Sequence, residues 1–333
     1  MFKEFQIFAA PLAGITDKPF RKILRKCAPD AALETEMISC HSLVEQHKNC
    51  PRNFDRYDDE GLIGAQIFGA EPELMATAAK ILEQQGAKWV DINMGCPVPK
   101  VATRAGAGAF LMRDHKLAGK IITEVVKAVK IPVSIKTRLG WDDAHLDSAE
   151  LVRIAANAGV QFATIHGRTR AQGYAGKADW NKIAKIVGTH ICAQLPRSGS
   201  NIIAPNGAMG RNYAPLQIPV IFNGDIKTEG DIAAVEKLGA SGAMIGRALL
   251  GNPWLLGKLS GSSKFSAFSS QLILEHFDLV LDYYGERTGV PMFRKHAAWY
   301  SNGMQNSAEF RTKVNKIARA DDMSEALREF FIL

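Results

Sequence analysis

The stretch KWVDINMGCPVPKV, residues 88 to 101, joins a mostly apolar run to a polar turn. Such a run is typical of a strand that is buried on both faces of a parallel sheet. Asn93 lies near the end of the run, and Cys96 follows between Gly95 and Pro97. A buried strand that ends in polar side chains predicts one β–α unit, with its chemical groups at the carboxyl end of the strand.

Seven further runs of this kind occur along the chain. In order, the eight runs are FQIFAAP, AALETEM, LIGAQIF, KWVDINM, PVSIKTR, FATIHGR, IPVIFNG and GAMIGRA. Helix-like stretches alternate with them, for example at 71–84, 115–129, 147–157 and 228–238. Eight β–α units predict an α/β fold, the TIM (β/α)8 barrel.

Polar residues gather at one end of this predicted barrel. At or just past the ends of the eight runs stand Pro11, Glu36, Gln66, Asn93, Lys136, His166, Asn223 and Gly246. Each has a structural explanation when taken singly, since Lys136 can extend toward solvent and His166 can be a core histidine. Barrel enzymes build their active sites at the carboxyl ends of the strands, so the shared position favours a functional pocket.

The chain is expected to form two domains. The barrel covers residues 1–256 and is interrupted at 187–217 by an irregular segment rich in Gly, Pro, Asn and Ser. That insertion follows a helix and precedes the seventh strand, so it should emerge at the end of the barrel away from the pocket. A Ser-rich linker at 261–270 leads into a small helical domain over 257–333, with helical patterns at 270–286, 291–303, 307–319 and 322–331.

Composition narrows the class of protein. The five cysteines are an odd number without a C-x-x-C pair, which argues against a disulfide framework and a zinc site. No apolar stretch approaches the roughly 20 residues that cross a bilayer. We therefore expect a cytoplasmic monomer without a membrane segment or a bound metal.

Charge points to a polyanionic partner. The net charge is +7, and the segment from Pro291 to Arg319 interleaves basic residues with Trp299, Tyr300 and Phe310. Its basic residues are Arg294, Lys295, Arg311, Lys313, Lys316 and Arg319. A second basic cluster covers residues 18–26. Such segments are typical of nucleic-acid binding, although a solvated helix face has the same pattern.

The seventh and eighth runs continue into NGDI and IGRALLGNPW, at the place where barrels commonly hold a phosphate through loop amides and a helix N-terminus. Arg247 can add a bidentate contact, and Lys136 and His166 make the pocket basic. The amides of Gln66 and Asn93 can meet the edge of a planar ring. These features together fit flavin mononucleotide (FMN).

The motifs APLAGITDKPFR, GAQIFG, DINMGCPVPKV, SIKTRLGWDD, IHGRTRAQGYAGKADW, NGDI and MIGRALLGNPW resemble those of tRNA-dihydrouridine synthases, in order and over essentially the whole chain. The late motif RKHAAWY resembles the bacterial B-type branch. The resemblance implies that FMN, reduced by NADPH or NADH, is used to reduce the C5–C6 double bond of uridine in the D-loop of tRNA.

The resemblance also implies roles for individual residues. Cys96 matches the catalytic cysteine that protonates C5, and an ordinary thiol is protonated near neutral pH. Asn93 and Arg168 match residues on the substrate side, and Arg294, Lys295 and His296 match the RNA-binding helical domain. The implied FMN contacts are Pro11, Leu12, Ala13, Gln66, Lys136, His166, Asn223, Gly224, Asp225, Gly246 and Arg247.

Two other functions remain open from the sequence. A flavin barrel that reduces a free pyrimidine or a dihydroorotate-type substrate can also carry N-x-x-C-P after its fourth strand, although the helical tail argues against it. The other alternative is an RNA-binding barrel that has lost catalysis because the insertion at 187–217 disturbs the seventh strand.

Overall fold

The computed structural model describes residues 5–46, 54–99, 101–102, 105–188, 218–261 and 268–331. Eight parallel strands close into a barrel in sequence order, because β1 pairs with both β2 and β8. This barrel confirms the predicted TIM-barrel fold. The strands are β1 (Gln6–Ala9), β2 (Ala32–Ser39), β3 (Ile63–Phe68), β4 (Trp89–Met94), β5 (Val133–Arg138), β6 (Phe162–His166), β7 (Val220–Asn223) and β8 (Gly242–Ile245).

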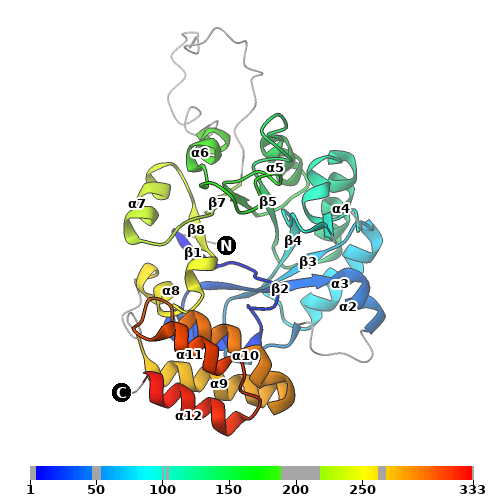
Figure 1. Ribbon diagram of the computed structural model, residues 1–333. Coiled ribbons are helices and arrows are strands. Elements are labelled where there is room, and N and C mark those ends of the chain that lie inside the picture. The colour runs from blue at the N-terminus through cyan, green and yellow to red at the C-terminus, as the bar shows by residue number, and fades with distance from the viewer. Residues whose placement is uncertain are drawn as a thin grey trace.

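Helices surround the barrel, as Figure 1 shows. The predicted helices at 71–84, 115–129, 147–157 and 228–238 correspond to α3, α4, α5 and α7. The barrel helices are α1 (Lys18–Cys27), α2 (Cys40–Gln46), α3 (Pro72–Gln84), α4 (His115–Ala128), α5 (Ser148–Asn157), α6 (Trp180–Gly188), α7 (Glu229–Lys237) and α8 (Trp254–Leu259), with 3-10 helices η3 (Gly108–Met112) and η5 (Arg247–Leu249).

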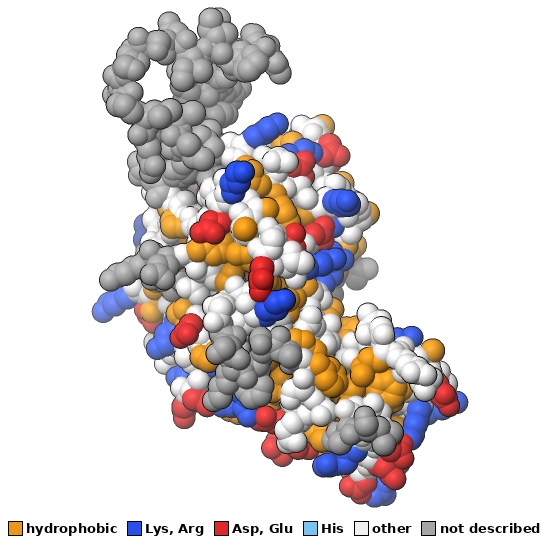
Figure 2. All heavy atoms as spheres, turned by 90° about the vertical axis from the view of Figure 1, so that its left-hand side faces the viewer, with side chains coloured by type: hydrophobic (Ala, Val, Ile, Leu, Met, Phe, Trp, Pro, Cys, Tyr) orange, Lys and Arg blue, Asp and Glu red, His pale blue; other side chains and the backbone are white. Residues whose placement is uncertain are grey.

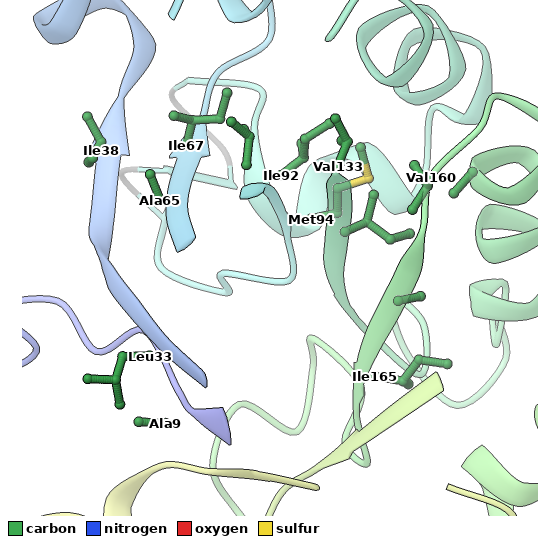
Figure 3. Close-up of a cluster of buried hydrophobic side chains, with 14 of the residues drawn as sticks. Ala9, Leu33, Ile38, Ala65, Ile67, Ile92, Met94, Val133, Val160 and Ile165 are labelled. Carbon is green, nitrogen blue, oxygen red and sulfur yellow. The ribbon is translucent and has the colours of Figure 1, made fainter. Parts of the chain in front are cut away.

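Alternation along β4 separates two layers of the core. Val90, Ile92 and Met94 belong to the apolar layer between the barrel and its helices, part of which Figure 3 shows. Trp89 belongs to the cluster inside the barrel, where its ring meets Phe8 edge-on with centroids 6.2 Å apart. Since side chains alternate along a strand, the same period that buries Trp89 turns Asp91 and Asn93 toward the barrel interior.

The remaining helices form a group with its own apolar core. They are α9 (Ser270–Tyr284), α10 (Glu286–Tyr300), α11 (Ser307–Val314) and α12 (Ala320–Phe331). Phe277, Phe293 and Leu327 are buried in that core. In Figure 1 the group lies on one side of the barrel, next to α8, and α9 contacts α1.

Several predicted boundaries differ from the observed ones. The helix expected to begin at Pro291 begins at Glu286, so the proline lies inside α10, and α11 ends at Val314 rather than at residue 319. The expected domain boundary at 256 falls inside α8, because Leu256 and Leu259 pack into the barrel core.

The predicted insertion at 187–217 lies outside the described residues apart from its start in α6, as does most of the Ser-rich linker. The strand after the insertion is in place, since β7 pairs with β6 and β8.

Within the described ranges, no helix is both long and apolar enough to cross a membrane. On the face in Figure 2, Lys and Arg side chains are interspersed with Asp and Glu side chains.

Candidate functional site

A pocket opens at the carboxyl ends of the strands and has a volume of about 1000 Å³ when its open mouth is included. Loops after several strands contribute to it, so residues that are far apart in the sequence meet there. The predicted residues that line it are Pro11, Leu12, Ala13, Gln66, Asn93, Cys96, Lys136, His166, Asn223, Gly224, Asp225, Gly246 and Arg247. The barrel therefore brings one catalytic candidate, eleven cofactor candidates and the substrate candidate Asn93 to a single site.

Cys96 is held at the pocket by its own backbone. Asn93 Oδ1 accepts hydrogen bonds from the backbone N–H groups of Gly95 at 3.2 Å and Cys96 at 3.0 Å. Arg138 Nε donates to the carbonyl of Gly95 at 2.7 Å. Hydrogen bonds thus fix the turn from both sides. Cys96 is half-buried there and is one of the residues that line the pocket.

Burial raises the pKa of the Cys96 thiol above its ordinary value. The backbone N–H of Val98 and the charges of Arg138 and Lys136 act in the opposite direction, but they do not cancel the effect of burial. A thiol with a raised pKa keeps its proton at neutral pH and is suited to act as an acid rather than as a nucleophile.

The basic side of the pocket centres on Lys136. Its Nζ donates to Asn223 Oδ1 at 3.2 Å, and Asn223 Nδ2 donates to the carbonyl of Met244 at 2.7 Å, which fixes the orientation of the amide. Burial, followed by the charge of Arg138, lowers the pKa of Lys136 to about 8. Burial and then Lys136 lower the pKa of His166 to about 2, so this imidazole is neutral at physiological pH.

Two buried carboxyl groups lie inside the barrel close to Lys136. Burial, and then the charge of Asp91, raise the pKa of Glu34 well above its ordinary value. Burial raises the pKa of Asp91 to about 6, against hydrogen bonds from Ser134 and Gln66. Neither carboxyl group was predicted as a site residue, because neither stands at the end of its apolar run, although alternation from Asn93 points to Asp91.

Arg168 lies behind the pocket and does not line it, in contrast to the predicted substrate contact. It is 2% exposed, and its guanidinium donates to two loop carbonyls and to Asp225 Oδ2 at 2.6 Å. Arg168 therefore supports the loops that form the site.

Gly224 has φ +108°, and a Cβ there would approach Ala178 Cβ at 2.8 Å, so this turn requires glycine.

Asp225 and Arg247 form the region predicted to hold a phosphate. Arg247 Nη2 lies 3.4 Å from Asp225 Oδ1, and its side chain is 51% exposed, which leaves donors free for a ligand. Burial opposes the ionisation of Asp225, but the N–H of Ala178 and the charge of Arg168 bring its pKa below the ordinary value. The segment directly after β8 is only the short 3-10 helix η5, so the candidate phosphate contacts are Arg247, Lys227 and the loop at Gly224 and Asp225.

The pocket is also lined by residues that were not predicted, among them Arg138, Tyr174 and Lys227. Arg138 lies two residues after Lys136 in the same strand, so alternation alone places both on the inner face. Tyr174 is 56% exposed at the pocket, and the guanidinium groups of Arg138 and Arg247 lie 5.4 and 5.0 Å from its ring centroid. The exposed aromatic ring offers a flat face at the entrance.

One strand-end residue does not reach the pocket. Glu36 instead accepts a hydrogen bond from the backbone N–H of Gly14. The register of β2 shifts between Glu34 and Met37, and Met37 lines the pocket in place of Glu36. A bulge adds a residue to one strand and so redirects the side chains that follow it. A strict inward–outward alternation along β2 assumes that no such bulge is present.

The three residues expected to bind RNA from the helical domain have different environments. Arg294 donates to the carbonyl of Ile317 at 2.6 Å, and Lys295 donates to the carbonyl of Gly14 in the loop after β1. His296 is 3% exposed and packs against aromatic rings of α1, α9 and α10. Burial, and then the charge of His276, lower its pKa well below the ordinary value. This places His296 in the core, where it cannot offer a charged surface contact.

The pocket fits a phosphorylated, planar cofactor. Lys136, Arg138 and Arg247 supply positive charge, and amide groups line the inner wall. His166 Nδ1 is buried without a hydrogen-bond partner in the described part of the chain, and a ligand atom would satisfy it. No group of three His, Cys, Asp or Glu side chains is placed to hold a metal ion among the described residues.

Comparison with known proteins gives consistent matches. The family model for dihydrouridine synthase (Dus) matches residues 8–191 and 211–332. A "Probable tRNA-dihydrouridine synthase" of Rickettsia prowazekii (strain Madrid E) is 37% identical over 335 residues, covering 98% of this chain and 94% of the relative. The "tRNA-dihydrouridine synthase B" of Xanthomonas axonopodis pv. citri (strain 306) is 36% identical, covering 98% of this chain and 92% of the relative.

Proposed function

Because the chain belongs to the dihydrouridine synthase family, we propose that it reduces the C5–C6 double bond of uridine in the D-loop of tRNA. The observation that carries this proposal is the position of the protonated Cys96 thiol in one pocket with Lys136, Arg138 and neutral His166. An acid and a cationic ring-binding site are the two parts that the reaction requires from the protein.

FMN is the cofactor proposed for this pocket, with NADPH or NADH as the reductant. Bound FMN would supply a hydride for C6 of the uracil ring. Lys136 would hold negative charge at the ring, and Arg247 with the loop at Gly224 and Asp225 would hold the phosphate. Pro11, Leu12 and Ala13 would close the pocket from the loop after β1.

Cys96 completes the reduction by donating its proton to C5. Addition of a hydride at C6 and a proton at C5 converts the double bond to a single bond, and water then reprotonates the thiolate. Burial of the thiol supports this role because it disfavours the thiolate before the reaction. The hydrogen bonds of Asn93 to the turn fix the backbone from which the sulfur would reach the uracil ring.

The substrate would be bound in part by the helical domain that α9 to α12 form. A uridine must leave its stack to enter the pocket, which costs a few kcal/mol that contacts elsewhere offset. Arg311 and Lys316 are the best candidates for phosphate contacts, because Lys313 is paired with Glu329 at 2.6 Å and Arg319 with Asp321 at 3.5 Å. A monomeric enzyme that acts on tRNA in the cytoplasm without a metal is part of this proposal.

The two alternatives have less support. A reductase of a free pyrimidine has no use for the basic segment from Pro291 to Arg319 of the helical domain. A barrel without catalysis would be expected if the insertion disrupted β7, yet this strand pairs on both sides and Asn223 at its end contacts Lys136.

The proposal is tested with purified protein, FMN, NADPH and an unmodified tRNA transcript. Mass spectrometry of the digested tRNA should detect dihydrouridine, and tRNA should raise NADPH consumption above the background oxidation by oxygen. Free uracil and uridine are the control substrates. Oxidation of NADPH with free uracil as readily as with tRNA would support the reductase alternative, and a protein that cannot bind FMN would support the non-catalytic one.

A further inference from the structure

A buried carboxylate lies beneath the pocket and has no role in the proposed mechanism. Asp91 is 0% exposed and faces the barrel interior from β4. Its Oδ1 accepts a hydrogen bond from Ser134 Oγ at 2.5 Å, and its Oδ2 accepts one from Gln66 Nε2 at 2.7 Å. Both oxygens of Asp91 are thus engaged by neighbouring strands.

The hydrogen bonds continue from Gln66 to the cysteine turn. Gln66 Oε1 accepts from Asn93 Nδ2 at 2.7 Å. Asn93 Oδ1 accepts from the backbone N–H groups of Gly95 and Cys96. A continuous chain of hydrogen bonds, from here on the amide relay, therefore runs from Ser134 through Asp91, Gln66 and Asn93 to the backbone of Cys96.

Both ends of the amide relay independently enforce one and the same arrangement of the Gln66 and Asn93 amide groups. A carboxylate can only accept hydrogen bonds, so Gln66 must direct its nitrogen toward Asp91. Backbone N–H groups can only donate, so Asn93 must direct its oxygen toward the Cys96 turn. If either amide rotated by 180°, two acceptors or two donors would face each other in a buried site.

This orientation decides what the pocket offers to a ligand. The oxygens of both amides are occupied within the amide relay, whereas each amide nitrogen has a second hydrogen. Gln66 and Asn93 both line the pocket, and Asn93 Nδ2 also lies 3.1 Å from the weak acceptor Met37 Sδ. An acceptor edge of a planar ring that enters the pocket would therefore meet amide N–H groups at the inner wall rather than amide oxygens.

We propose that Asp91 and Ser134 are positioning residues, which hold Gln66 and Asn93 in the donor-presenting orientation and, through Asn93, hold the backbone of Cys96. The inference rests on the proposed function, because it assigns a task to residues beneath that site. Glu34 and Lys136 are the charged groups that face Asp91 within the barrel. At pH 7.5 the Asp91 carboxyl, whose pKa burial raises to about 6, is ionised and accepts both hydrogen bonds.

The test compares Asp91→Leu, Asp91→Asn, Ser134→Ala and the double variant Asp91→Asn/Ser134→Ala at pH 7.5. Thr164→Val serves as the matched control, since Thr164 is buried on the neighbouring β6 outside the amide relay. Three quantities are measured: the Kd of the apoprotein for FMN by flavin fluorescence, the alkylation rate of Cys96 mapped by mass spectrometry, and kcat and KM with tRNA.

Asp91→Leu removes the acceptor, so we expect the Kd for FMN to rise and kcat to fall by about tenfold, the loss expected for one hydrogen bond to a charged group. Alkylation of Cys96 should become several-fold faster because its turn is released. Asp91→Asn should stay close to wild type, because its oxygen can face Gln66 while its nitrogen donates to Ser134 Oγ. Ser134→Ala should also have a small effect.

The double variant gives the decisive result. Without the Ser134 hydroxyl, nothing orients the new asparagine, so its Kd and alkylation rate should approach those of Asp91→Leu and exceed the product of the single effects. This comparison holds even if Asp91→Leu does not fold. If the effects in the double variant were strictly additive, or if Thr164→Val changed the Kd for FMN and the alkylation rate as much as Asp91→Leu does, the proposed role of Asp91 and Ser134 would be wrong. A wild-type protein that forms no dihydrouridine would refute the proposed function instead, while the FMN and alkylation measurements would still test the relay.

Discussion

Tyr284 Oη donates a hydrogen bond to Asp17 Oδ2 at 3.0 Å and thereby joins α9 of the helical domain to the loop that follows β1. Asp17 also caps α1, because its Oδ1 accepts from the backbone N–H of Phe20 at 3.0 Å. The same loop contributes Leu12 and Ala13 to the pocket. Contact with the helical domain and the shape of the cofactor site therefore depend on one short segment.

Tyr284→Phe is expected to lower the free energy of unfolding by about 1–3 kcal/mol, because it leaves a buried carboxylate oxygen without its donor. The Kd for FMN should rise as well, since the loop at Leu12 and Ala13 is less firmly held. Urea denaturation and flavin fluorescence measure the two effects. Wild-type values for both would mean that this hydrogen bond does not couple the helical domain to the pocket.

Asp17→Asn is expected to change how stability depends on pH. Burial raises the pKa of Asp17 from 3.8 to about 6, against the hydrogen bond from Phe20. The native carboxyl therefore binds its proton more tightly than the unfolded one. Its contribution to stability is complete below about pH 3.8 and is lost as the pH rises through about 6.

Asparagine can keep the cap of α1 without this titration. The stability of Asp17→Asn relative to wild type should therefore be more favourable at pH 7.5 than at pH 4.5, by about 2 kcal/mol. Urea denaturation at the two pH values measures the difference. A difference that is the same at both values would show that Asp17 titrates alike in the native and unfolded chains.

Lys136 should give the apoprotein a pH-dependent affinity for FMN. Burial lowers its pKa to about 8, so the ammonium group is charged at pH 7 and loses its proton as the pH rises through about 8. We expect the Kd for FMN to rise over this range, because an anionic ligand loses a cationic partner. Lys136→Met should bind weakly throughout and lack the step. A step of equal size in that variant would assign it to another group.

Cys96→Ala should separate cofactor chemistry from product formation. The variant should bind FMN and still oxidise NADPH with oxygen, because the basic side of the pocket is unchanged. Dihydrouridine formation in tRNA should fall by about two to four orders of magnitude, the usual contribution of a positioned acid. Mass spectrometry of tRNA nucleosides measures the product, and an unchanged yield would remove Cys96 from the proton transfer.

The helical domain offers a contrast between surface charges and a buried histidine. Arg311→Ala combined with Lys316→Ala should raise KM for tRNA, weaken its dependence on salt and leave stability nearly unchanged. His296→Ala should instead lower the free energy of unfolding by about 2–4 kcal/mol, because it opens a cavity among aromatic rings. Filter binding at several salt concentrations and thermal unfolding distinguish the two classes. A weaker salt dependence in His296→Ala would contradict its placement in the core.

The barrel could be predicted because its signals are local. Each strand is a short apolar run, and polar pocket residues such as Asn93 and His166 stand at the ends of such runs. Since the ends of parallel strands meet at one face, the sequence order was enough to expect Cys96 and Lys136 in one pocket. The motif containing Cys96 further indicated the family, which the family model confirmed.

Other features depend on contacts that no local pattern contains. Arg294 and His296 lie two residues apart in a basic segment of the sequence. His296 is nevertheless in the core, whereas Arg294 donates a hydrogen bond to a carbonyl of the α11–α12 connection. Arg168 appeared to be a substrate residue because of its motif, whereas the fold turns it away from the pocket toward Asp225.

The sequence by itself determined the closed barrel, the helices that follow it and the loop that carries Cys96, because hydrophobic periodicity and turn residues act over a few positions. Only the tertiary structure decided which polar groups are partners. Asp91 and Gln66 are 25 residues apart along the chain, and their hydrogen bond exists because β3 and β4 are neighbours in the barrel. The pKa values of Lys136, His166 and Cys96 have the same origin, since burial and nearby charge are properties of the assembled pocket.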